Sequence, residues 1–234
     1  MERTYKYLPW FFVLILILAP IGFQKYLGRL ALMEKQHFYV HFHAVLMTLW
    51  CGILIAQPIL ILQGKRKAHQ WIGRWSYGLV PILLISIFMM LYHSLFVDGK
   101  IALTTESVQQ LFFPFTQILI FGLFYLMAIK NVRRPRIHMR YVIVSSVSLL
   151  GPTIGRIDFE SVGLPNLDWD LLVMEGSLLG FLLWDRLKSG KIKPYIQGLL
   201  AFVLVHVLLT AGFQETVVWA IIGAQLSKLL VVVF

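Results

Sequence analysis

Eight apolar stretches of roughly membrane-spanning length follow one another along this chain, separated by short polar connections. A helix needs about 20 predominantly apolar residues to cross the hydrocarbon core of a bilayer. Of the 234 residues, 59% are hydrophobic and 14% are charged, whereas about a quarter of a soluble domain is charged. The composition therefore excludes a water-soluble fold. The stretches are 8–23, 38–63, 77–97, 109–130, 141–157, 169–187, 194–213 and 217–234.

This pattern predicts an all-α integral membrane protein, a bundle of seven or eight transmembrane helices that forms one polytopic domain over residues 1–234. We expect the polar core to come from helices within about 38–157. The helices at 8–23 and 169–234 are expected to be peripheral.

The first and last stretches need separate arguments. The first follows Arg3 and Lys6, as a signal peptide would, but no small-residue cleavage site follows it, so we expect a retained span. The last stretch carries Lys228. It either crosses the membrane with the lysine snorkelling to the surface or lies in the interface.

Basic residues collect in alternate connections, which sets the orientation of the chain. The connections 65–74, 130–140 and 186–193 lie on the same side as the N-terminus. The acidic residues on the other side are Glu34, Asp98, Glu106, Asp158, Glu160, Asp168, Asp170 and Glu215. The positive-inside rule then places the N-terminus in the cytoplasm of a bacterial-type inner (plasma) membrane. The net charge of +10 is an orientation signal, so lipid is the predicted partner and nucleic acid is not.

The chain has seven histidines, and several fall inside or beside the apolar stretches. Histidine within a bilayer is costly, so each such ring indicates a candidate functional site. His43, Trp50 and Gln57 are spaced by seven residues, which places them on one helix face. His37 and His41 share a different face of the same helix.

Two arginines are expected in the polar core, and Glu175 of the following stretch is expected to pair with one of them. Arg140 precedes the stretch 141–157, and Arg156 lies near its outer end, beyond a kink expected at Pro152. Glu175 lies about 10 Å below the outer surface by helical rise. We expect Arg156 and Glu175 to pair, because a pair costs less in the membrane than either charge alone.

Several of these positions form a pattern that resembles a family of uncharacterised bacterial multi-span proteins, the domain-of-unknown-function 2306 group. The pattern is His-x-His, then Trp and Gln, then a His with Gly four residues later, and further on Pro-x-x-His before a helix with Pro and Arg. The matching positions are His41, His43, Trp50, Gln57, His69, Gly73, Pro135, His138, Arg140, Pro152 and Arg156. The resemblance covers about residues 38–157, departs at Gln70 where the pattern has arginine, and implies no established activity.

The main functional interpretation is a buried histidine site that binds haem or a metal ion, and b-type haem is its first candidate. Two axial histidines must come from separate helices at equal depth. His69 and His138 meet this condition on the cytoplasmic side, and His43 and His93 on the outer side. The layout resembles that of cytochrome b561, except that the stretch 109–130 has no histidine. This interpretation predicts electron transfer or support of a respiratory complex, with another membrane protein as partner.

Two alternatives stay open. One is a zinc-dependent membrane hydrolase in which His37, His41 and Glu175, together with His93, approach one another near the outer surface. The other is a structural, assembly or transport role, in which His206 is a packed histidine bonded to a neighbouring helix. In a transport role the His43 face can line a path for water or protons, because histidine titrates near neutral pH.

Overall fold

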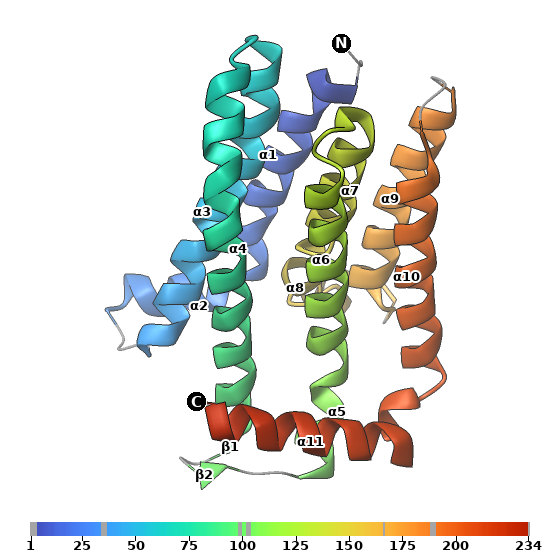
Figure 1. The fold of residues 1–234 in the computed structure, drawn as a ribbon. Coiled ribbons are helices and arrows are strands. Elements are labelled where there is room, and N and C mark those ends of the chain that lie inside the picture. The colour runs from blue at the N-terminus through green and yellow to red at the C-terminus, as the bar shows by residue number, and fades with distance from the viewer. Residues whose placement is uncertain are drawn as a thin grey trace. The chain divides into compact units, whose positions relative to one another are not determined.

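The computed structural model describes residues 4–33, 37–97, 100–101, 104–165, 167–187 and 191–233. They divide into two compact units, one up to Met90 and one from Leu91 onwards. The described residues are helical apart from loops and one short antiparallel pair, β1 (Phe96–Val97) with β2 (Lys100–Ile101) (Figure 1). The prediction of a helical protein is confirmed for this part of the chain.

The first unit consists of α1 (Thr4–Gly22), α2 (Gln24–Ala31), α3 (Phe38–Leu62) and most of α4 (Arg66–Ser94). α1 and α3 run side by side (Figure 1), and α2 bends away from α1 by 64°. The buried residues of α1 and α3 recur every three or four positions, so each helix buries one face. They include Leu8, Phe12 and Ile15 on α1 and Leu46, Trp50 and Leu54 on α3.

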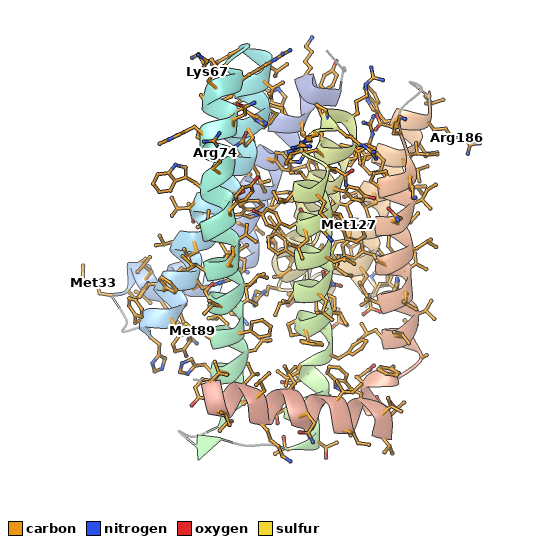
Figure 2. All side chains as sticks on the ribbon, in the orientation of Figure 1. Met33, Lys67, Arg74, Met89, Met127 and Arg186 are labelled. Atoms are coloured by element: carbon orange, nitrogen blue, oxygen red, sulfur yellow. The ribbon has the colours of Figure 1, made fainter. Side chains whose placement is uncertain are left out.

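A tight turn joins α3 to α4. Gly64 has a φ of 74°, in the left-handed region that glycine adopts without strain, and it ends α3. Lys67 and Arg74 lie towards one end of α4, and Met89 lies towards the other (Figure 2). The basic residues of this hairpin are therefore at its turn, as the charge pattern predicts.

The second unit contains α5 (Thr105–Gln110), α6 (Phe112–Lys130), α7 (Pro135–Val147), α8 (Leu150–Ile154), η1 (Glu160–Val162), α9 (Trp169–Leu187), α10 (Lys193–Thr210), η2 (Phe213–Glu215) and α11 (Val217–Val233). Figure 1 shows α6, α7, α9 and α10 alongside one another, whereas α11 lies across their direction. α9 and α10, expected at the periphery, supply the fully buried Leu171, Met174, Leu178 and Phe202.

Gly198 allows three helices of this unit to approach closely. A Cβ atom at this position of α10 would lie 2.5 Å from Cγ1 of Val144 on α7 and 3.1 Å from Cδ1 of Leu178 on α9. Both neighbours are completely buried. Small residues at helix contacts are typical of membrane bundles, where close packing replaces the hydrophobic effect.

Four described helices are long and apolar enough to cross a membrane: Phe38–Leu62, Arg66–His93, Thr105–Lys130 and Lys193–Thr210. The bent pair α1–α2 would make a fifth. A protein with several membrane spans is thus supported.

The other predicted stretches form helices that do not pass this test of length and composition in the described chain. Stretch 141–157 divides into α7 and α8, which are separated by Ser148 and Leu149. α9 has 19 residues and falls outside the candidate set, and α11 has 17 residues.

Candidate functional site

His43 joins α3 to α4 within the first unit. Its Nδ1 lies 2.9 Å from Oγ of Ser86, which in turn donates to the carbonyl oxygen of Leu83 at 2.7 Å. Because the only hydroxyl hydrogen of Ser86 is used there, Nδ1 of His43 is the donor. Nε2 of a neutral His43 then carries the lone pair.

The other members of the predicted His43 face also approach α4. Gln57 donates from Nε2 to the carbonyl oxygen of His69 at 3.2 Å, and Gly73 lies against the same amide. Trp50 is 3% exposed. His43 and Gln57 each lie two turns from Trp50, on opposite sides of it along α3. Both therefore connect α3 to α4 by a hydrogen bond.

His41 and His37 have local partners in the same unit. Nδ1 of His41 is hydrogen-bonded to the hydroxyl of Tyr26 at 2.9 Å, which connects α3 to α2. The ring of His37 stacks on Tyr39, with their centroids 5.2 Å apart.

In the second unit, His138 lies in the first turn of α7, before the apolar stretch. Its Nδ1 donates to the carbonyl oxygen of Ala128 on α6 at 2.8 Å, since a carbonyl can only accept. In the neutral ring, Nε2 then has the lone pair.

Arg140 forms a buried ion pair that the sequence pattern did not reveal. Its Nε donates to Oδ2 of Asp185 at 2.6 Å, and the two side chains are 1% and 2% exposed. A second guanidinium nitrogen donates to the carbonyl oxygen of Arg136. Asp185 lies beside the basic 186–193 connection, so its only signal was an acidic residue among cations.

His206 contacts two carboxylates at once. Its Nδ1 lies 3.0 Å from Oε1 of Glu175 on α9, and its Nε2 lies 3.7 Å from Oδ2 of Asp168 just before α9. The expectation that His206 is bonded to a neighbouring helix is confirmed, and its partner is Glu175.

The predicted pairing of Arg156 with Glu175 has a different outcome. Glu175 is hydrogen-bonded to His206, while the exposed Arg156 donates to the carbonyl oxygen of Pro152 one turn earlier. His206, and not Arg156, is therefore the partner of Glu175.

A cavity of about 480 Å³ lies beside this cluster, within the second unit. Four carboxylates and three aromatic rings are among its lining residues, and none of the described lining residues is basic. The lining comprises Phe113, Ile154, Gly155, Ile157, Asp158, Phe159, Glu160, Pro165, Leu167, Asp168, Trp169, Asp170 and Leu209.

Local contacts fix the wall of this cavity. Trp169 donates from its ring nitrogen to the carbonyl oxygen of Pro165 at 2.9 Å, and its ring lies 5.4 Å from that of Phe159. Gly155 leaves room for Asp170, since a Cβ atom there would lie 3.2 Å from Oδ2 of that carboxylate. Gly163 turns the loop with a φ of 80°.

No three histidine, cysteine or acidic side chains in the described part of the chain are placed as ligands of one metal ion. The zinc interpretation, with His37, His41 and Glu175, therefore has no assembled ligand set. Each haem pair takes one histidine from each unit, His43 with His93 and His69 with His138, so both stay predictions.

Sequence reasoning placed most weight on the histidines of residues 37–138, whereas Asp168, Glu175 and His206 form a polar cluster in the described part of the chain. The sequence did contain a signal for this cluster. His206 is a histidine within one apolar stretch and Glu175 is an acid within the preceding one, so the two suggest a pair. In comparisons with known proteins, no protein-family model, no curated protein and no solved structure matches this chain.

Proposed function

We propose that this chain is a multi-pass protein of a bacterial-type inner membrane, with its N-terminus in the cytoplasm. Its seven crossings would be α1, α3, α4, α5–α6, α7–α8, α9 and α10. The alternation of basic and acidic connections supports this orientation. The length of α11, 17 residues, and its course across the other helices of its unit support a surface position for it.

The proposed activity is proton-coupled transport, in which protons pass through the outer part of the membrane along Asp168, His206 and Glu175. The observation that carries it is an imidazole on a candidate membrane span with a carboxylate facing each ring nitrogen. Chains of acidic residues and histidine within membrane segments are typical of proton relays in pumps and transporters.

The exposure of these side chains falls along the relay. Asp168 is 43% exposed, His206 is 23% exposed and Glu175 is 19% exposed. Asp168 and Glu175 are seven residues apart, which corresponds to about 10 Å along a helix. A proton would thus pass from a solvated carboxylate to a more enclosed one through the ring between them.

The chemistry requires both ring nitrogens. In the neutral ring Nδ1 donates to Glu175, so Nε2 has the lone pair. A proton delivered by Asp168 binds Nε2, and the proton on Nδ1 then passes to the carboxylate of Glu175. The step at Asp168 requires a rotation of its side chain, because 3.7 Å exceeds hydrogen-bond distance. Rotation of the ring afterwards restores the starting tautomer.

Proton flux into liposomes tests this proposal. Purified protein is reconstituted with an internal pH-sensitive dye, and an inward driving force is imposed with valinomycin and a potassium gradient. We expect flux with the wild-type chain, and loss of at least ten-fold of the rate with His206→Gln and with Glu175→Gln. His41→Gln is the matched control, and its rate should match the wild type. A wild-type rate equal to that of empty liposomes, or an undiminished rate with His206→Gln, refutes the proposal.

Haem b binding is the second candidate function. His138 supports it, because its Nδ1–H is held by a backbone carbonyl and its Nε2 has the lone pair that an iron ligand needs. Such a site would serve electron transfer with a respiratory partner, and it would use residues of the stretch that resembles the uncharacterised multi-span family. A Soret band in purified protein that disappears with His138→Ala and with His69→Ala supports this candidate. A colourless preparation eliminates it.

A further inference from the structure

We propose that the acidic and aromatic cavity of the second unit binds an organic cation, an alkylammonium compound with an apolar body. This inference rests on the proposed function, because Asp168 lines the cavity and also begins the relay. It identifies the class of solute that accompanies the proton.

The charge of the lining favours a cation. The lining contains four carboxylates, and its described residues include no lysine or arginine. Arg156 is the nearest basic residue in sequence, between the lining residues Gly155 and Ile157, and it donates a hydrogen bond to the carbonyl oxygen of Pro152. One arginine against four carboxylates leaves the cavity with an excess of negative charge.

The arrangement of the carboxylates favours a large cation over a metal ion. Calcium requires several oxygen ligands at about 2.3–2.6 Å from one point. The described residues contain no group of three acidic, histidine or cysteine side chains with such geometry. Carboxylates distributed around 480 Å³ instead complement a positive charge that is spread over methyl or methylene groups.

Aromatic rings supply the second part of the recognition. Trp169, Phe159 and Phe113 line the same space as the carboxylates. Phe159 and Trp169 are tilted by 40° to each other, so they present two differently oriented faces. Ring faces attract ammonium groups within about 6 Å, and aromatic cages are the usual sites for quaternary ammonium ligands.

Calorimetric titration of detergent-purified protein tests the proposal without a membrane gradient. The probes are choline, tetramethylammonium and n-butylammonium chlorides, and 3,3-dimethylbutan-1-ol serves as the neutral isostere of choline. We expect saturable binding of at least one cation, and at least ten-fold weaker binding of the isostere. No saturable binding of any cation, or equal affinity for choline and its isostere, overturns the proposal.

Variants assign the binding to this cavity. Asp168→Asn/Asp170→Asn should weaken cation binding at least ten-fold, and Trp169→Leu should do the same while Trp169→Phe restores most of it. Glu106→Gln removes an exposed acid outside the lining and should have no effect. Undiminished binding by the double aspartate variant, at an unchanged thermal midpoint, overturns the assignment. So does calcium chloride that binds saturably and displaces the organic cation.

The two proposals can fail separately. Glu175→Gln changes a relay residue that is not part of the lining, so it should bind the cation with unchanged affinity while its proton flux is lost. Cation binding without any proton flux in the wild type refutes the relay alone. Proton flux without cation binding refutes this inference alone.

Discussion

At the scale of single residues, the pair formed by Arg140 and Asp185 carries the clearest energetic consequence. Both side chains are almost completely buried and are joined by a 2.6 Å contact between α7 and α9. Bringing two charges out of water costs several kcal/mol each, so the pair adds little net stability compared with a well-packed apolar pair. Removing one partner leaves the other charge uncompensated, and this asymmetry can be measured.

We predict that Arg140→Met and Asp185→Asn each lower the free energy of unfolding by about 3–5 kcal/mol. The double variant Arg140→Met/Asp185→Leu should recover most of this loss. Unfolding by sodium dodecyl sulfate in mixed micelles, followed by circular dichroism, measures the change. Arg186→Met is the control, because Arg186 is exposed on the same helix. Single variants as stable as the wild type would mean that the pair contributes nothing to the fold.

For Gln117 we predict the opposite effect, a gain in stability when the side chain is replaced. Gln117→Met retains the length of the side chain and removes a buried amide without partners, so it should raise the free energy of unfolding by about 1–3 kcal/mol. Gln197→Met is the matched control. The amide oxygen of Gln197 accepts from the hydroxyl of Tyr141 at 2.7 Å, so this variant should lower stability. Both are measured by the same denaturant titration, and a destabilised Gln117→Met variant contradicts the prediction.

At the scale of elements, α11 is held by a small number of specific contacts. Trp219 donates from its ring nitrogen to the carbonyl oxygen of Val108 at 2.9 Å, and its ring meets Phe112 edge to face at 5.0 Å. A Cβ atom on Gly223 would lie 2.5 Å from Cγ1 of Val108. α11 therefore docks on α5 and the start of α6 through a glycine and an aromatic ring.

We predict that Gly223→Leu releases α11 from this docking surface. The assay uses a cysteine at the buried Leu226 in a Cys51→Ala background, labelled with a water-soluble maleimide. Gly223→Leu should raise the labelling rate at least ten-fold. Gly180→Leu is the control, because nothing lies within 4 Å of a Cβ atom at that exposed glycine of α9. Equal labelling rates for the two variants would show that Gly223 does not govern docking.

The break between α7 and α8 shows what a sequence can and cannot indicate at this scale. Pro152 predicts a disturbance, because it cannot donate to the carbonyl oxygen four residues earlier, that of Ser148. The break lies at Ser148 and Leu149, where the hydroxyl of Ser148 bonds to the carbonyl oxygen of Ser145. Serine hydroxyls compete with the backbone ladder. The location of the break depends on these local hydrogen bonds, which the spacing of apolar residues does not indicate.

At the scale of the whole molecule, the apolar stretches were sufficient to predict the helical fold of the described residues, several of whose helices are long and apolar enough to cross a membrane. The length of an apolar stretch and the charge of a connection are local properties of the sequence, so they can be determined without knowing any tertiary contact. The partners of buried polar side chains cannot be determined in this way. Asp185 and His206 meet residues 45 and 31 positions away, and helix packing alone selects them.

The proposed topology gives a prediction for the whole chain. In a Cys51→Ala background, a cysteine at Lys228 should react with a membrane-impermeant maleimide on intact cells. A cysteine at Asn131, in the basic connection between α6 and α7, should react only after permeabilisation. Labelling of position 228 only after permeabilisation would place α11 across the membrane and raise the number of crossings to eight.

The long separation between Arg140 and Asp185 also has a consequence for biogenesis. The ribosome completes α7 before it reaches the aspartate, 45 residues later. Until then the guanidinium of Arg140 has no carboxylate to compensate its burial in the bundle. We therefore expect α7 to reach its final packing only after α9 has emerged.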